Sequence, residues 1–449
     1  MPIDRFDARV RHSLAQIADE VAALAARVEG QVSKRGGGVE VRLGYKQTES
    51  GPIPNDWEVR ALLSAVRVAT GQVDPRNEPF SSMVLVAPDH IEAQTGRLLA
   101  KKTARDQRAI SGKYVFEAGD IVYSKIRPYL RKATLASFGG LCSADMYPLK
   151  PAADVVGGFM LSVLLGDRFS KYAESVSVRS GMPKINRAEM ADFVVALPPV
   201  HEQWAIAEAL SDIDALLAGL SRLIAKKRDL KQAAMQQLVT GQTRLPGFQG
   251  EWEVKRLGEL ADVKTGPFGS SLHESDYVLD GTPIITVEHL GEFGVEHLNL
   301  PMVSELDRRR LQAYSLDAGD IVFSRVGSVD RNALIRSAEA GWLFSGRLLR
   351  VRPDRRQAYA QFLSYQFHSE PFKALVRSVA VGQTMASLNT QILKGIKVGL
   401  PPLSEQTAIA AVLSDIDAEL TALEARRAKT RALKQAMMQE LLTGRTRLL

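Results

Sequence analysis

The chain has 449 residues, of which 45% are hydrophobic and 24% are charged. This length is too great for one compact core, and the composition excludes disordered and collagen-like proteins and suits two or more globular domains. No stretch approaches the ~20 apolar residues of a bilayer span, and the first residues lack the plan of a signal peptide, so we expect a cytoplasmic protein. The formal net charge of +7 favours a polyanionic partner.

The chain begins with an alanine-rich stretch over residues 5–33, in which apolar side chains recur at helical spacing. Three consecutive glycines follow at 36–38. The sequence therefore predicts an extra helix and a flexible linker over residues 1–40. Two interpretations of this helix stay open: it packs on the rest of the assembly, or it is a loosely attached appendage. The apolar stripe consists of Leu14, Ile17, Val21, Leu24 and Val28.

Residues 41–200 contain short apolar runs separated by glycine and proline, a pattern typical of short strands. One strand is predicted over 121–124, directly after a turn over 117–120. Helical structure is predicted over 157–173. We therefore expect a mixed α+β domain here.

Basic side chains are concentrated in one part of this domain, because residues 97–132 hold ten basic residues and three acidic ones. Arginine can donate two hydrogen bonds to guanine O6 and N7, and both arginine and lysine neutralise phosphates. These side chains are therefore candidate DNA contacts, and ordinary surface charge remains the alternative for each single one. The candidates are Lys101, Lys102, Arg105, Arg108, Lys125, Arg127, Arg131 and Lys132.

A helical segment is predicted over residues 201–245. It follows a Leu-Pro-Pro sequence at 197–199, whose prolines favour an extended chain. Apolar residues then recur at alternating spacings of four and three, the a/d pattern of a coiled coil. A helix over 202–239 would be about 57 Å long at 1.5 Å per residue. The seam consists of Ile206, Leu210, Ile213, Leu217 and Leu220.

Residues 246–403 repeat the plan of the first domain. The sequence Ala-Gly-Asp-Ile-Val of residues 118–122 returns at 318–322, and helical structure is predicted over 357–378. Residues 308–356 hold eleven basic residues and five acidic ones. The candidate DNA contacts of this second domain are Arg308, Arg309, Arg310, Arg325, Arg331 and Arg336.

The last segment, residues 404–449, is a close copy of the first helical segment. At an offset of 203, residues 197–245 match residues 400–448 at 31 of 49 positions. Similar seams pair well, so we predict an intramolecular coiled coil, antiparallel if the two domains sit at opposite ends; packing of each seam on its own domain is the alternative. The second seam consists of Ile409, Leu413, Ile416, Leu420 and Leu423. The fold class is therefore α+β, with a pseudo-twofold internal repeat.

Lysines and arginines also follow both predicted helices, at residues 226–231 and 426–434. Two interpretations stay open for them. They form the solvated face of a coiled coil, or they contact phosphates or an acidic partner.

The sequence contains no recognisable active site. Gly112-Lys113 is followed by tyrosine rather than serine or threonine, so no phosphate-binding loop is present. The seven histidines lack metal-ligand spacing, and the single cysteine, Cys142, excludes a disulfide within the chain and a four-thiolate zinc site. We expect Cys142 in a core, and no catalytic residue, metal or cofactor in this chain.

Two copies of Leu-Pro-Pro-x-x-Glu-Gln, at 197–203 and 400–406, each lead into a Ser-Asp-Ile-Asp helix and end in Leu-x-Thr-Gly-x-Thr-Arg-Leu. This arrangement resembles the specificity subunit (S subunit, HsdS) of type I restriction-modification systems. Residues 44–54, ahead of Trp57, and residues 119–127 also look like parts of that family's first target-recognition domain.

The resemblance implies a concrete function. Each target-recognition domain would read one half of a bipartite, asymmetric site in double-stranded DNA. The paired helices would set the gap and dock two modification (M, methyltransferase) subunits, and restriction (R) subunits would join them. S-adenosylmethionine, ATP and Mg²⁺ would be used by those partners. The alternative is a non-catalytic assembly protein whose two domains bind proteins or RNA, with the coiled coil as a spacer.

Overall fold

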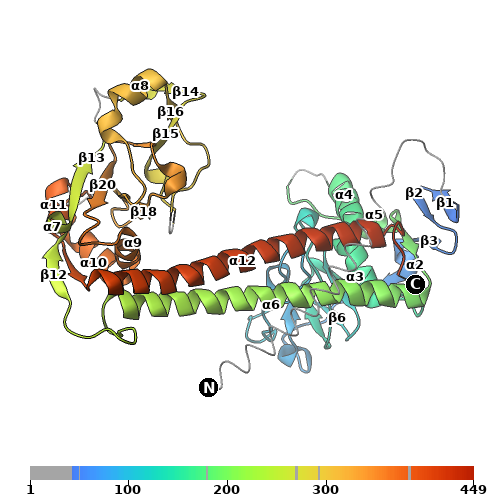
Figure 1. The fold of residues 1–449 in the computed structure, drawn as a ribbon. Helices are drawn as coiled ribbons and strands as arrows, with labels where there is room; N and C mark the ends of the chain where they lie inside the picture. The colour runs from blue at the N-terminus through green and yellow to red at the C-terminus, as the bar shows by residue number, and fades with distance from the viewer. Residues whose placement is uncertain are drawn as a thin grey trace. The chain divides into compact units, whose positions relative to one another are not determined.

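The computed structural model describes residues 43–49, 51–177, 181–267, 272–291, 294–382 and 386–448, so the predicted N-terminal helix lies outside the described residues. The chain divides into two compact units (Figure 1). Unit 1 combines the residues up to 222 with those from 425 onward, and unit 2 consists of residues 223–424. Because both divisions fall within long helices, the predicted bounds between domains and helical segments stay predictions.

A four-stranded antiparallel sheet forms the centre of unit 1, with the strand order β4-β10-β7-β8. These strands are β4 (Val66–Val68), β10 (Met146–Pro151), β7 (Ile121–Ser124) and β8 (Ala133–Leu135). Its other strands are β1 (Tyr45–Thr48), β2 (Gly51–Pro54), β3 (Glu58–Ala61), β5 (Leu85–Val86), β6 (Tyr114–Phe116), β9 (Gly140–Cys142) and β11 (Val194–Leu197). Its shorter helices are α2 (Leu62–Ala65), α3 (Gly157–Leu165), α4 (Asp167–Val176) and α5 (Arg187–Ala191).

Unit 2 repeats this sheet as β13-β20-β17-β18. These strands are β13 (Ala261–Thr265), β20 (Leu348–Pro353), β17 (Ile321–Ser324) and β18 (Asn332–Leu334). Its other strands are β12 (Glu253–Arg256), β14 (Tyr277–Val278), β15 (Thr282–Ile285), β16 (Met302–Val303), β19 (Leu343–Phe344) and β21 (Lys397–Leu400). Its shorter helices are α7 (Leu257–Leu260), α8 (Glu305–Arg310), α9 (Ala360–His368), α10 (Glu370–Val379) and α11 (Thr390–Gly395).

The second sheet beside each central sheet differs between the units. Unit 1 has three strands in the order β5-β9-β6, whereas unit 2 has four in the order β14-β16-β15-β19. The turn over 117–120 therefore joins β6 and β7, which belong to different sheets. Cys142 lies in β9 and is fully buried, as expected, and burial raises the pKa of its thiol to about 12.

The helical structure predicted in each domain is confirmed, but each predicted segment forms two helices. In unit 1, α3 and α4 are separated by Gly166, and in unit 2, α9 and α10 are separated by Ser369. Both of these residues have an extended backbone that ends the first helix and begins the second. The helices pack on the sheet, so that Phe159 and Phe169 join the core of unit 1.

The two long helices are α6 (Val200–Val239) and α12 (Leu403–Leu441), which confirm the predicted helices. Within each unit they run antiparallel and side by side (Figure 1). In unit 1, Ile206 and Ile213 of α6 share one core with Met437 and Leu441 of α12 and with the domain itself. Pairing of the two helices and packing of each seam on its own domain therefore occur together, because the same residues contact both.

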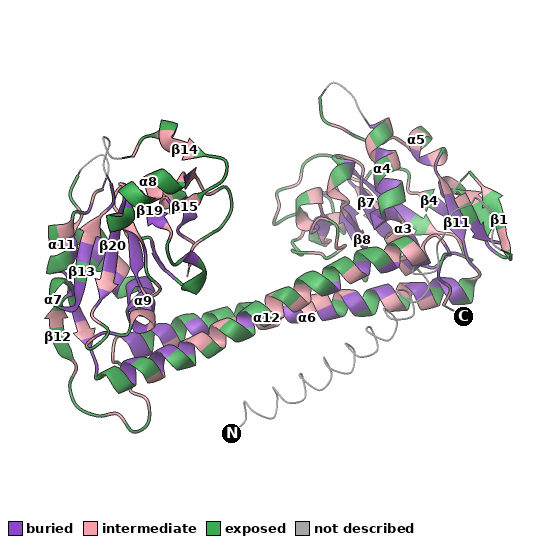
Figure 2. Cartoon of the chain, turned by 45° about the horizontal axis from the view of Figure 1, so that its top comes forward, coloured by how far each residue is buried: buried purple, intermediate pink, exposed green. Residues whose placement is uncertain are grey.

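The burial of the seam follows the predicted pattern with local shifts (Figure 2). Leu217, Ile416 and Leu423 are only half-buried, whereas Leu216 is buried. In α6 the buried position therefore lies one residue earlier than the seven-residue repeat predicts. The buried seam residues are Ile206, Leu210, Ile213, Leu220, Ile409, Leu413 and Leu420.

Among the residues that the structure describes, none of the helices combines the length and apolar character that a membrane crossing requires.

Candidate nucleic-acid interface and the brackets that hold it

A buried glutamate at the start of α6 links this helix to the segment after α12 in unit 1. Glu202 has no exposed surface, and its carboxylate accepts a 3.0 Å hydrogen bond from Nε1 of Trp57. Arg447, beyond the end of α12, donates to both oxygens of Glu202, at 2.7 and 2.8 Å. Arg447 also pairs with Asp56 at 2.7 Å, and its hydrogen bond lowers the pKa of that carboxyl. These four residues form what we call the first bracket.

An equivalent glutamate in unit 2 links the start of α12 to the segment after α6, and we call this arrangement the second bracket. Glu405, at the start of α12, is fully buried and accepts hydrogen bonds of 2.5 and 2.6 Å from Arg244, beyond the end of α6. The hydrogen bond to Glu405 raises the pKa of Arg244. Trp252 occupies the place of Trp57, but its Nε1 has no hydrogen-bond partner among the described residues.

The brackets explain the most strongly repeated parts of the sequence. In each unit the glutamate begins one long helix and the arginine follows the other, so the Glu-Gln and Thr-Arg-Leu motifs meet across the helix pair. The neighbouring glutamines are also equivalent. The Gln203 side chain accepts from the Val156 amide at 2.8 Å, and the Gln406 side chain accepts from the Tyr359 amide at 2.7 Å.

Several basic residues of the long helices pair with acidic residues of the facing helix. Lys231 lies 2.5 Å from Asp417 in unit 2, and Lys434 lies 2.6 Å from Asp214 in unit 1, which is the equivalent pair. Burial raises the pKa of Asp214, against the opposing effect of Lys434. Lys227 and Arg228 pair in turn with Glu419 and Glu424. These four cations therefore pair across the two helices, and Lys231 and Lys434 do so with mostly buried side chains.

The predicted contacts of the loop before β6 are all exposed. Arg105 pairs with Glu78 and donates to Ser81 Oγ at 2.9 Å, and Lys101 lies 4.6 Å from the centre of the Phe138 ring. The side chains of Lys102 and Arg108 make no hydrogen bond or ion pair with another described residue. The loop therefore presents free cations beside anchored ones.

The predicted contacts after β7 fall into two groups. Lys125 and Lys132 are half-buried: the first lies 5.2 Å from the centre of the Tyr147 ring, and the second donates to the Pro88 carbonyl at 2.7 Å. Arg127 is exposed, and its side chain has no partner among the described residues.

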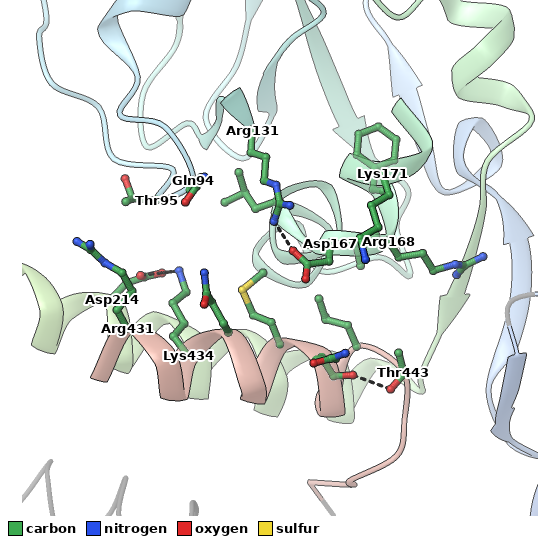
Figure 3. A pocket seen from close by; sticks show the side chains of 18 of the residues that line it. Gln94, Thr95, Arg131, Asp167, Arg168, Lys171, Asp214, Arg431, Lys434 and Thr443 are labelled. Atoms are coloured by element: carbon green, nitrogen blue, oxygen red, sulfur yellow. Dashed lines mark hydrogen bonds and ion pairs between the residues drawn. The ribbon is translucent and has the colours of Figure 1, made fainter. Parts of the chain in front are cut away.

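Arg131 points into a cavity of about 540 Å³ between α4 and the end of α12, within unit 1 (Figure 3). There it pairs with Asp167 and donates from Nε to Ser170 Oγ at 2.8 Å. Asp214 and Lys434 line another side of this cavity. Arg131 is thus engaged inside the unit, which makes it a weaker DNA candidate than the sequence indicated.

In unit 2 the triple arginine lies on α8, and its members pair with acids of the same helix. Arg308 and Arg309 contact Glu305 at 2.6 and 3.1 Å, and Arg310 contacts Asp307 at 2.8 Å. The hydrogen bond from Arg308 lowers the pKa of Glu305 to about 2. Exposed pairs of this kind contribute little stability, so DNA could exchange with them.

Two of the remaining candidates of unit 2 contact the backbone. Arg325 donates to the Gly346 carbonyl at 3.1 Å, and Arg331 donates to the Leu290 carbonyl. Arg331 and Arg336 are exposed, whereas Arg325 is half-buried. The structure thus leaves the DNA contacts of both units as predictions, but it separates the exposed candidates from the anchored ones.

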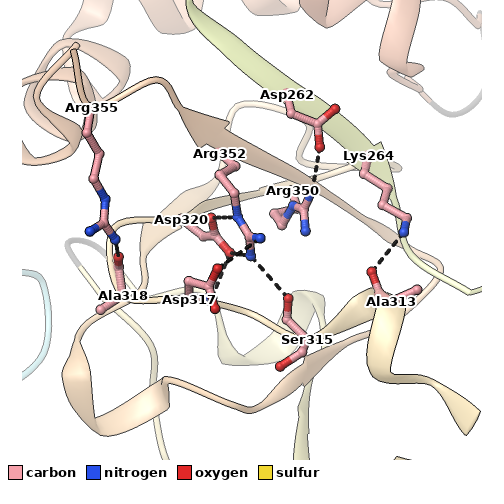
Figure 4. Close-up of polar contacts among 10 residues, drawn as sticks. All are labelled: Asp262, Lys264, Ala313, Ser315, Asp317, Ala318, Asp320, Arg350, Arg352 and Arg355. Carbon is pink, nitrogen blue, oxygen red and sulfur yellow. Dashed lines mark hydrogen bonds and ion pairs between the residues drawn. The ribbon is translucent and has the colours of Figure 1, made fainter. Parts of the chain in front are cut away.

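Further arginines between 308 and 356 have structural roles (Figure 4). Arg352 donates to both carboxylate oxygens of Asp320, at 2.6 and 2.7 Å, and pairs with Asp317 at 2.9 Å. Arg350 pairs with Asp262, and Arg355 donates to the Ala318 carbonyl at 2.9 Å. The number of basic residues between 308 and 356 therefore overstates the positive charge that is available to bind a polyanion.

Sequence reasoning missed the brackets, although their signal was present. Trp57 and Trp252, Glu202 and Glu405, and Arg244 and Arg447 all recur in the aligned copies. A charged residue that recurs in both copies at the start of a helix indicates a buried ion pair. Charged residues are rarely buried without a partner.

Comparison with known proteins decides the family. The family model for the type I restriction modification DNA specificity domain matches residues 54–226 and again residues 249–431. The chain belongs to this family. Its two matched regions are the two copies that the internal repeat defines.

Individual relatives agree with this assignment. The chain is 26% identical over 433 residues to the MjaVIII specificity subunit of Methanocaldococcus jannaschii, covering 90% of this chain and 96% of that protein. It is 31% identical over 226 residues to the EcoDI specificity subunit of Escherichia coli, a match that spans 49% of this chain and only 48% of that protein. The role of a specificity subunit in a type I restriction-modification system follows from the family.

Solved structures share the fold. The chain resembles a structure described as showing complex assembly and conformational transition of the type I R-M system, with a TM-score of 0.59 and 21% identity over 88% of this chain and 99% of that one. The type I S subunit from M. genitalium gives a TM-score of 0.55 with 15% identity, over 90% of this chain and 98% of that one. The predicted fold class, with two mixed domains and paired long helices, is confirmed.

Proposed function

We propose that each unit of this specificity subunit reads one half of a bipartite, asymmetric site in double-stranded DNA. The observation that carries the proposal is the repeated central sheet, accompanied in both units by a buried Glu-Arg pair between the long helices, beside a second sheet that differs. Two equivalent attachments with two different surfaces suit a protein that presents two unlike readers to one DNA molecule. The exposed cations of each unit supply the charge for phosphate and base contacts.

The paired helices would set the unspecified gap between the half-sites and dock two methyltransferase subunits, which restriction subunits would join. The chain itself would carry out no catalysis. S-adenosylmethionine, ATP and Mg²⁺ would act in the partner subunits. Support for this division comes from four cations of the long helices that pair with acids of the facing helix: Lys227, Arg228, Lys231 and Lys434.

The direct test maps N6-methyladenine in a host that lacks other adenine methyltransferases, with this chain and its neighbouring methyltransferase co-expressed. A split motif that appears only with this chain is expected. No new methylation would favour the assembly-protein alternative. Binding measurements add a second criterion, since specific duplex binding should weaken steeply with salt yet keep its sequence preference.

An insertion tests the division of labour between domains and helices. Four residues placed after Leu223 and after Arg426 lengthen both helices by about 6 Å. We expect an altered gap, or loss of methylation, with the bases of each half-site unchanged. Altered half-site bases would contradict the proposed division.

A further inference from the structure

The loop after β7 contains a residue that combines an unfavourable backbone with a free charged side chain. Arg127 has φ 48° and ψ 60°, the left-handed conformation. Residues with a Cβ atom are disfavoured there, because Cβ comes too close to the following carbonyl oxygen. Pro128 adds to the cost, since the residue before a proline prefers an extended backbone.

Unit 2 supplies an internal control at the equivalent position, which is Gly327. The amide of Arg127 donates to the Pro183 carbonyl at 2.8 Å, and the amide of Gly327 donates to the Ala386 carbonyl at 2.9 Å. Gly327 is also left-handed, with φ 76°, a conformation that glycine adopts without steric cost. The shared loop therefore requires this backbone, and unit 2 meets the requirement with the favourable residue.

A second arginine in the same loop has the same backbone conformation, but its side-chain contacts offset the cost. Arg131 is also left-handed, with φ 48°, but its guanidinium pairs with Asp167 and donates to Ser170. The Arg127 side chain is exposed and makes no hydrogen bond or ion pair with a described residue. Among the described residues, no hydrogen bond or ion pair of the Arg127 side chain offsets the cost of its backbone. Uncompensated strain of this kind is concentrated at functional sites.

The surroundings of Arg127 suit a contact with a DNA groove. Tyr129 is 48% exposed, and Met182, on the adjoining segment that the Arg127 amide bonds to, is 52% exposed. Lys184 is exposed on the same segment and makes no ion pair with a described residue. A forked donor with apolar neighbours and a lysine matches the combination of base-edge and phosphate contacts.

We propose that Arg127 is a specificity-determining residue of the first domain, which donates hydrogen bonds to the edge of a guanine in that domain's half-site. The inference rests on the proposed function. A guanine edge and a backbone phosphate both accept hydrogen bonds from arginine, but only the guanine contact carries sequence information. Lysine separates the two, because it neutralises a phosphate as a point charge and lacks the planar fork.

The test compares Arg127→Gly and Arg127→Lys with the unsubstituted chain, each assembled with its methyltransferase subunits. The methylated motif is mapped, and affinity is measured for duplexes in which each guanine of the half-sites is replaced in turn. Lys102→Ala is the matched control, since Lys102 is also exposed and basic without a partner in the described chain. We expect this control to leave the motif unchanged.

For Arg127→Gly we expect a melting temperature that is unchanged or raised by about 2 °C. Discrimination at one guanine of the first half-site should fall about tenfold or more, with the second half-site unaffected. Arg127→Lys should lose the same discrimination. A full motif in the glycine variant, or restored discrimination in the lysine variant, would overturn the role of Arg127. Absence of a motif with the unsubstituted chain would overturn the proposed function itself.

Discussion

The two units use the same bracket but differ in the sheet beside it. Glu202 with Arg447 and Glu405 with Arg244 have the same geometry, whereas the orders β5-β9-β6 and β14-β16-β15-β19 share neither number nor connection of strands. Residues that must fit the helix pair are repeated, and residues that face outward have diverged. Near-identity between the copies therefore marks attachment, and divergence marks the surfaces free to differ in what they bind.

The largest effect should come from breaking the brackets. Glu202→Ala leaves Arg447 and the Trp57 indole without their buried acceptor, which should destabilise unit 1 by about 3–5 kcal/mol. Glu405→Ala should cost about 1 kcal/mol less, because Trp252 has no hydrogen bond to lose. Denaturant unfolding, with hydrogen exchange to assign the loss to one unit, measures both. Equal losses would mean that the indole hydrogen bond contributes nothing.

The paired helices offer the next comparison. Removing Lys434 or Asp214 should each cost about 1–2 kcal/mol, and a double-mutant cycle should reveal coupling of about 1 kcal/mol. The equivalent pair, Lys231 and Asp417, should couple at least as strongly, because Lys231 has only 7% of its side chain exposed. Additive losses in both cycles would show that the pairs are incidental.

The two bracket tryptophans give a finer contrast. Trp57→Phe removes the donor to Glu202 and should cost about 1–2 kcal/mol, beyond the cost of a smaller ring. Trp252→Phe removes an unpartnered donor, so only the change in packing remains. Thermal unfolding of the two variants checks the difference, and an equal or larger loss for Trp252→Phe would contradict the asymmetry.

The smallest effect concerns pH. Arg447 lowers the pKa of Asp56 in the folded state, so this carboxyl stabilises unit 1 above its unfolded pKa of about 3.9 and ceases to do so as pH falls through the folded value. Because the pair is half-exposed, the contribution should stay below about 1 kcal/mol. Asp56→Asn should therefore lower the melting temperature at pH 7 and have little effect near pH 2. The same loss at both pH values would contradict an ionic contribution.

The internal repeat and the heptad seams determined the architecture from sequence, since periodicity and near-identity are local properties of the chain. They predicted α6, α12, their pairing and the two α+β domains. The break at Gly166 was missed because extended backbone at one residue leaves the helical pattern on both sides intact. The shift from Leu217 to Leu216 was missed because it depends on how the domain packs on the helix.

The candidate DNA contacts show the limit of composition more sharply. Arg131, Arg350 and Arg352 look the same as Arg127 in the sequence, yet the first three are held by carboxylates from distant parts of the chain. Whether these three arginines are free depends on which acids the fold brings to them, and no local pattern around them contains that information. The sequence by itself determined the repeat, the helices and the family. Only the tertiary structure decided that Arg131, Arg350 and Arg352 are paired, because their partners lie far away in the sequence.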